Sequence, residues 1–441
     1  MVKPLLLLSL LSVQAFAVQI APFRADVTPP VGAPLCGGLV KPAVGVSEPL
    51  LALGVVLLSD EKPVVLCAID FCEIRGADHI HWREVLATAA GTSAERVALH
   101  SLHQHNAPLV DNAAQKLLPE IGILDAAATE KALAGIAASI GAALKAPQPV
   151  THISTGEAKV LEVAGNRRVQ VIDGKVGKMR GSGSKDPVLR ALPEGLIDPF
   201  LKTVSFWNGD KKLAALHYYA THPMSYYGDG IISHDFAGMA REKRTQEEGV
   251  PHIYFTGCGG NIGAGKYNDG APANRTVLRD RMADAMRRAK AAEKPVSLDA
   301  VRWVSESVAM PLRTGKGFGE EEIVAAIADA KLDVKQRANH ARYLAFLRMT
   351  KGGRKIDLTA LRLGSFSVLH MPGELFVEYQ LAAADMRKGE LVATAAYGDY
   401  GPMYIGTARA YDEGGYETSA VSRVGPAVED VLMGAMRKVL G

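Results

Sequence analysis

Apolar runs of strand length alternate with helical patterns along this chain. Residues 51–58 and 63–71 are continuous apolar runs, which are typical of buried strands. A helical pattern follows over 78–90, and a further strand pattern over 96–102. The alternation continues with strands at 150–154, 202–207, 212–219, 301–310, 355–369 and 391–396, and with helices at 126–145, 236–248, 273–290, 320–330, 375–387 and 426–439. Interleaved elements of this kind predict an α/β fold, which we expect to be one large mixed-sheet domain with helices packed around it.

Two long polar stretches interrupt this pattern, at residues 173–187 and 257–273. Irregular loops of this length often lie beside a functional site. The first contains Gly181-Ser182-Gly183-Ser184 but lacks the G-x-S-x-G pattern of a nucleophile elbow, so we expect a flexible surface loop without a catalytic serine.

The N-terminus carries the signature of an export signal. Lys3 is followed by an apolar run over residues 5–11 and by Ala15-Phe16-Ala17, a small-x-small cleavage pattern. We therefore predict a signal peptide at residues 1–17, a mature domain at 18–441, and a secreted or periplasmic protein. The apolar run is too short to span a bilayer, and no later run reaches the ~18 apolar residues of a spanning helix, so no stable membrane anchor is expected.

Composition narrows the partners of the protein. The chain has 441 residues, 50 basic and 47 acidic, and a formal net charge of +3 without a basic block, which argues against nucleic acid as a partner. The four cysteines are too few for a disulfide framework, and we expect buried, inert thiols. Composition leaves the oligomeric state open.

Three strand ends carry residues that bind metals. His103 and His105 follow the strand at 96–102, and two histidines at i and i+2 share one face of an extended segment. Alone, this pair equally fits a polar strand end with hydrogen-bonded histidines. His222 follows a second strand and Glu374 a third, each at a turn. Three ligands plus an open position are the composition of a catalytic zinc site, so the sequence predicts Zn²⁺.

With these segments in view, nearly the whole mature chain resembles the neutral ceramidase family, zinc enzymes that hydrolyse the amide bond of ceramides. The resembling segments are Phe23-Arg24-Ala25-Asp26-Val27-Thr28-Pro29-Pro30-Val31-Gly32, Ser101-Leu102-His103-Gln104-His105-Asn106-Ala107-Pro108, Asn166-Arg167, Ala220-Thr221-His222-Pro223-Met224-Ser225, Pro372-Gly373-Glu374, and the register of Tyr404, Tyr411 and Tyr416-Glu417. The resemblance implies zinc ligands at His103, His222, Glu374 and Tyr404. It further implies an active-site arginine at Arg167 and a tyrosine over the reacting carbonyl at Tyr416.

Two departures from the family pattern bear on the substrate. Gly263 falls where the family carries an active-site serine, and Asn261 is one of the nearby polar residues that could stand in. We also expect no counterpart of the family's C-terminal immunoglobulin-like domain, since the sequence stops at Gly441 just after the last predicted helix. The polar loop at 266–270 suits a hydrophilic substrate better than a lipid, so a small molecule and a lipid-like compound both remain candidates.

The sequence hypothesis is a secreted zinc-dependent amidohydrolase that cleaves an N-acyl bond, ceramide-like or other. Zinc would activate water, His105 would take its proton, and Tyr416 with Arg167 would stabilise the oxyanion. Ser233 or Asp235 could cap the helix that begins here, or His234 or Asp235 could orient a zinc histidine. The alternatives are a zinc-dependent esterase or glycan-directed hydrolase, and a non-catalytic binding protein on the same scaffold.

Overall fold

Three large sheets form the frame of the molecule, and the computed structural model describes them within residues 18–298 and 300–441. The first sheet contains, in spatial order, β6 (Val97–Ser101), β4 (Val64–Ile69), β3 (Leu51–Leu58), β1 (Gln19–Asp26) and β8 (Gln148–Pro149). The second contains β16 (His252–Thr256), β14 (Lys211–Tyr219), β13 (Phe200–Asn208), β9 (His152–Lys159) and β18 (Lys294–Val296). The third contains β19 (Val301–Val308), β20 (Ile356–Leu363), β21 (Phe366–His370) and β23 (Leu391–Ala395). The predicted mixed-sheet α/β architecture is confirmed, while the predicted signal peptide at 1–17 lies outside the described residues.

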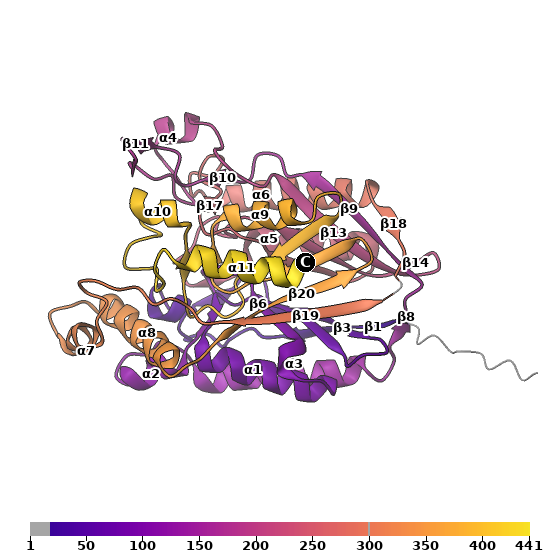
Figure 1. Ribbon diagram of the computed structural model, residues 1–441, viewed down its shortest axis with the longest axis horizontal. Helices are drawn as coiled ribbons and strands as arrows, with labels where there is room; N and C mark the ends of the chain where they lie inside the picture. The colour runs from indigo at the N-terminus through magenta and orange to yellow at the C-terminus, as the bar shows by residue number, and fades with distance from the viewer. Residues whose placement is uncertain (1–17, 299) are drawn as a thin grey trace, which may run out of the picture.

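Helices and short strand pairs complete the fold (Figure 1). The helices are α1 (Gly76–Ala90), α2 (Asn112–Leu117), α3 (Ala126–Ala143), α4 (Pro187–Ala191), α5 (Asp235–Glu248), α6 (Ala273–Ala291), α7 (Glu320–Ala328), α8 (Val334–Lys351), α9 (Val377–Met386), α10 (Ala408–Glu413) and α11 (Val428–Leu440). The short pairs are β2 (Gly45–Val46) with β15 (Ile231–Ile232), β5 (Glu73–Ile74) with β7 (Leu109–Val110), β10 (Gly165–Asn166) with β17 (Ile262–Gly263), β11 (Val171–Ile172) with β12 (Lys175–Val176), and β22 (Glu374–Leu375) with β24 (Tyr404–Ile405).

The first sheet separates two apolar layers, because successive side chains of a strand point to opposite faces. On one face, Phe23 and Val56 belong to a core shared with α1 and α3, which lie along this sheet in Figure 1. On the other face, Ile20 and Val55 join a core shared with the second sheet. Helices α5 and α6 cover that second sheet. The layers are thus helix, sheet, sheet and helix.

Several elements differ from the sequence prediction, and the strands β1 and β16 were not predicted. The strand predicted over 355–369 is a hairpin, because Gly364 takes a φ of +58°, the left-handed conformation that glycine adopts without steric cost. Helix α8 was not predicted. Asp333 begins it by accepting a hydrogen bond from the Gln336 N–H at 2.8 Å, while the Gln336 side chain bonds back to the Asp333 N–H.

The C-terminal ends of strands from all three sheets meet at one place. Strand β6 ends beside the segment that follows β23, where the Ser101 N–H donates to Tyr397 O at 3.0 Å. That segment also contacts the end of β16, through the Ala396 N–H and Thr256 O at 2.9 Å. Each of β6, β16 and β23 pairs in parallel with a neighbour, so polar loops leave the sheets at a common edge.

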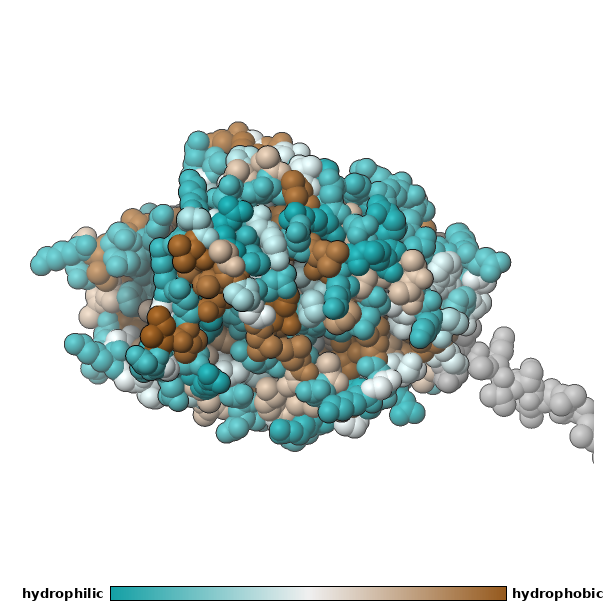
Figure 2. Space-filling view, turned by 90° about the horizontal axis from the view of Figure 1, so that it is seen from above, coloured by the Kyte–Doolittle hydropathy of each residue, from teal (hydrophilic) through white to brown (hydrophobic). Residues whose placement is uncertain are grey.

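Two further observations concern the surface of the molecule and its cysteines. No helix of the described ranges has the length and apolar character to cross a bilayer. On the face drawn in Figure 2, hydrophobic residues form separate groups among hydrophilic ones. All four cysteines are buried and none forms a disulfide, although the Sγ atoms of Cys36 and Cys72 lie within hydrogen-bond distance, 3.6 Å apart. Burial raises the pKa of the Cys67 thiol to about 12, in keeping with an inert thiol.

Candidate active site

His103 follows β6 in a conformation that the sequence did not predict. Its φ is +67°, a left-handed value that is uncommon for a residue with a side chain, so the H-x-H segment is bent and not extended. The Nδ1 atom lies 3.1 Å from the carbonyl oxygen of Cys72. A carbonyl only accepts, so Nδ1 carries a proton and Nε2 is the atom that can offer a lone pair to a metal. That Nε2 atom lies 3.3 Å from Glu374 Oε1.

His222 is held in the same way from the second sheet. It lies beyond the end of β14 and is fully buried. Its Nδ1 donates to two backbone carbonyls, Gly259 O at 2.6 Å and Ile262 O at 2.9 Å. The Nε2 atom, the one that can offer a lone pair to a metal, lies 2.9 Å from Glu374 Oε2.

Glu374 and Tyr404 are brought together by β22 and β24. A turn at Gly373, with φ +59°, leads from β21 into β22. In the β22–β24 pair, Glu374 lies directly beside Tyr404. Glu374 is 1% exposed, so its carboxylate points into the molecule. The Tyr404 hydroxyl lies 3.4 Å from His222 Nε2, and burial raises its pKa well above the ordinary value.

The donor set formed by these residues fits a zinc ion. Candidate ligand atoms of His103, His222 and Glu374 all lie within 4.8 Å of one another. His103 Nε2 and Glu374 Oε2 are buried without a hydrogen-bond partner among the described residues. Two imidazole lone pairs and a carboxylate all present negative potential to the same point, an arrangement that a cation stabilises. The carbonyl contacts of both Nδ1 atoms are typical of zinc histidines.

A second grouping is less suited to a metal. Cys72, Glu73 and His103 also approach one another. However, Glu73 is already paired with Arg75 at 2.5 Å, and the proton on His103 Nδ1 is bonded to the Cys72 carbonyl. Burial raises the pKa of the Cys72 thiol well above its ordinary value, which keeps it protonated.

His105 lies at the open side of this cluster. Its ring contacts that of His103 edge-on, with centroids 4.7 Å apart, and lies 5.0 Å from the ring of Tyr227, which is 49% exposed. Its Nδ1 has no hydrogen-bond partner among the described residues. Burial and the neighbouring histidines hold its pKa well below the ordinary value, so His105 is neutral and able to accept a proton.

Arg167 and Tyr416 complete the predicted set. Arg167 Nη1 donates to the Tyr404 hydroxyl at 3.0 Å, and its guanidinium is buried without a carboxylate partner in the described chain. Such a cation attracts negative charge that develops on a bound ligand. Tyr416 is 55% exposed, and its ring lies edge-on to Tyr404 at 5.6 Å, which places it at the mouth of the site.

Three predicted residues take other positions. His234 lies 3.6 Å from Asp70, and Asp235 accepts hydrogen bonds from Ser225. Neither orients a zinc histidine, because backbone carbonyls already take both Nδ1 protons. The Asn261 side chain accepts a hydrogen bond from the Val377 N–H and donates one to Glu378 at the start of α9, each at 2.9 Å, so it makes structural contacts.

The polar loop at 266–270 also has an internal role. Lys266 donates to the carbonyls of Arg190 and Leu192, the latter at 2.5 Å. Asn268 is fully buried and donates to the carbonyls of Ser182 at 2.9 Å and Ser225 at 2.6 Å. The hydrophilic composition of this loop therefore says little about the substrate.

Sequence reasoning missed two aromatic neighbours. The ring of Tyr397 stacks on His103 at 4.8 Å, and that of Tyr400 does so at 5.1 Å. The Tyr397 hydroxyl is buried without a hydrogen-bond partner within the described ranges. The available signal was the close spacing of Tyr397, Tyr400 and Tyr404 among glycines directly after a strand.

Comparison with known proteins places this fold. No family model matches the chain, and no curated protein matches it in sequence. Among solved structures, neutral ceramidase from Pseudomonas aeruginosa is similar with a TM-score of 0.70 and 16% identity, over 96% of this chain and 74% of that one. A ceramidase complexed with C2 gives a TM-score of 0.72 and 15% identity, over 96% and 75%. At these identities the chain shares the ceramidase fold.

Proposed function

We propose that this protein is a secreted, zinc-dependent amidohydrolase that cleaves an N-acyl bond. The observation that carries the proposal is the buried set of His103, His222 and Glu374, with both Nδ1 protons held by carbonyls and ligand atoms left without partners. Three such ligands with an adjacent phenol are the composition of a catalytic zinc site, and structural sites are usually closed by four.

The residues around this set support hydrolysis over storage of a metal. A bound zinc ion would supply Lewis acidity toward a carbonyl and acidify water. His105 is neutral, faces the ligand cluster and would accept the proton of the attacking water. Arg167 offers positive charge, and Tyr416 offers a phenol at the mouth, for an oxygen that becomes negative during the reaction. Tyr404 would complete the ligand set or donate a hydrogen bond beside it.

An N-acyl compound is the best supported substrate class. Both structural neighbours are described as ceramidases, one of them complexed with C2. The loop at 266–270 had favoured a hydrophilic substrate, but its polar groups are bonded within the protein. The amide-hydrolase hypothesis therefore stands ahead of the glycan-directed one.

Metal analysis coupled to a substrate panel tests the proposal. Purified protein should contain one zinc per chain, and it should release fatty acid from ceramide or from short N-acyl amines in a chelator-sensitive manner. Matched esters and glycosides in the same panel separate the reaction classes. Zinc binding with glycoside cleavage alone would replace the proposed substrate class, and absence of any metal would favour a binding protein.

A further inference from the structure

Gly263 lies opposite a hydroxyl that comes from another segment of the chain. A Cβ atom placed on Gly263 would lie 2.8 Å from the Oγ of Ser182 and 3.4 Å from the Nε of Arg167. The space beside the guanidinium is thus already taken by the Ser182 hydroxyl. A side chain at 263 would therefore force the Ser182 hydroxyl to move.

The loop that carries Ser182 is anchored, in contrast to the flexible surface loop expected from its sequence. Ser182 is 3% exposed although Gly181 and Gly183 are exposed. Asn268 holds the Ser182 carbonyl, and a Cβ on Gly265 would collide with the Gly181 carbonyl at 1.8 Å, so the two backbones are in close contact. The loop therefore fixes the position of the Ser182 side chain.

Arg167 connects Ser182 to the ligand cluster. Its Nη2 donates to Ser182 Oγ at 2.9 Å while its Nη1 donates to Tyr404 Oη at 3.0 Å. Tyr404 Oη in turn lies 3.4 Å from His222 Nε2. The hydrogen bonds of the described chain give the Ser182 hydroxyl this one donor and no acceptor, so its own proton is available to a ligand.

We infer that Ser182 supplies the substrate-binding hydroxyl of this site, in the place that a side chain at position 263 would otherwise occupy. Together with Arg167 it donates a hydrogen bond to the carbonyl oxygen of the bound N-acyl group. This inference rests on the proposed amidohydrolase function. A buried donor aimed at the oxygen where charge develops contributes on the order of 10²–10³ in kcat in other hydrolases.

Two single substitutions test this role. Ser182→Ala should lower kcat/KM for the N-acyl amide by about 10²-fold while one zinc per chain is retained. Ser184→Ala is the matched control, since Ser184 lies in the same loop and is also buried, and it should stay within about twofold of the parent, as expected for a side chain with no role in the reaction. Unchanged kinetics in Ser182→Ala would overturn the inference.

A rescue variant separates a hydroxyl at this point from a general packing effect. In the Ser182→Gly background, Gly263→Ser places a new hydroxyl beside Arg167, because the obstructing Oγ is gone. Recovery of at least about tenfold over Ser182→Gly alone is expected from the value of a single such donor. A double variant that folds and binds zinc but recovers no activity counts against the inference. A crystal structure in which the new hydroxyl contacts Arg167, with no gain in activity, does so as well.

A binding readout keeps this inference distinct from the proposed function. Acetohydroxamate, which carries a carbonyl and binds metals, is titrated into zinc-loaded parent and Ser182→Ala by calorimetry. Weaker binding in the variant supports Ser182 even where the parent cleaves no amide, an outcome that removes the proposed function alone. Amide cleavage that is insensitive to Ser182→Ala removes the Ser182 inference alone.

Discussion

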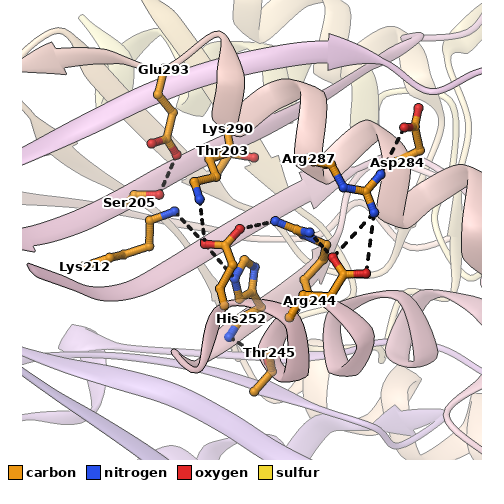
Figure 3. Close-up of polar contacts among 12 residues, drawn as sticks. Thr203, Ser205, Lys212, Arg244, Thr245, His252, Asp284, Arg287, Lys290 and Glu293 are labelled. Carbon is orange, nitrogen blue, oxygen red and sulfur yellow. Dashed lines mark hydrogen bonds and ion pairs between the residues drawn. The ribbon is translucent and has the colours of Figure 1, made fainter.

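Two clusters of histidine and glutamate in this protein differ in how their charges are compensated. In the candidate site, the ion-pair partners of Glu374 are His103 and His222, and no lysine or arginine of the described chain pairs with it. In the second cluster, Glu248 is paired with Lys212 at 3.0 Å, with Lys290 at 3.4 Å and with Arg244 (Figure 3).

The histidines of the two clusters also have different partners. His217 Nδ1 is bonded to the Thr203 hydroxyl and its Nε2 to His252 Nδ1, both at 2.8 Å, and His252 Nε2 lies 3.6 Å from Glu248. In the candidate site, the Nε2 atoms of His103 and His222 lie 3.3 Å and 2.9 Å from Glu374. Lysine and arginine already neutralise Glu248, whereas a bound cation could neutralise Glu374.

The largest expected effect comes from removing each glutamate in turn. Glu374→Gln should lose bound zinc and lower kcat/KM by at least about 10³-fold, because a neutral amide no longer balances the cation. Glu248→Gln should keep metal and activity. Metal content by mass spectrometry and amidase kinetics measure both, and full zinc occupancy in Glu374→Gln would remove the basis of the comparison.

Removal of zinc by a chelator should lower the thermal stability of proteins that keep the candidate site intact, whichever residue of the second cluster is changed. Zinc that binds only the native state stabilises it by about 4 kcal/mol at a free concentration ~1,000-fold above Kd. EDTA should therefore lower the melting temperature of the parent and of Glu248→Gln, and leave Glu374→Gln unchanged. Thermal unfolding with and without EDTA measures this difference, and an equal shift in all three proteins would place the metal elsewhere.

His105→Ala should separate proton transfer from metal binding. We expect a loss of about 10²-fold in kcat, at the lower end of the range for a general base, with zinc retained. The control is His81→Ala on the exposed side of α1. Loss of zinc in His105→Ala, with activity and metal falling together, would make His105 a ligand.

The smallest effect is the pH dependence of the second cluster, which contains His217, His252 and Glu248. Burial, reinforced by the charge of His252, holds the pKa of His217 well below its ordinary value of 6.5. The unfolded chain therefore binds a proton below pH 6.5 that the folded protein does not bind, and stability falls as the pH falls. Between pH 7.5 and 5.5 this one histidine should account for about 1.4 kcal/mol.

Urea unfolding at the two pH values measures that increment. His217→Gln should lose less stability on acidification than the parent, by roughly that amount, because glutamine does not titrate. His81→Gln, at an exposed position, should behave like the parent. Identical acid sensitivity in His217→Gln and the parent would show that His217 is protonated in the folded state.

The sequence predicted much of the fold for a clear reason. Strand β3 was predicted with its observed bounds because eight consecutive apolar residues at 51–58 allow little else in a domain of this size. Helix α8 was missed although its capping box was visible, since its many basic residues obscured the apolar face. Loop structure was predicted least well, as the case of Ser182 illustrates.

The candidate ligand residues could be predicted from the sequence, whereas the contacts around them could not. By itself, the sequence determined which side chains follow the strand ends, and because strands of parallel pairs end at a common edge, His103, His222 and Glu374 could be expected together. Only the tertiary structure decided which carbonyls take the Nδ1 protons and which hydroxyl stands beside Arg167. Those choices depend on contacts between loops far apart in the chain, and such contacts leave no periodic signal in the sequence.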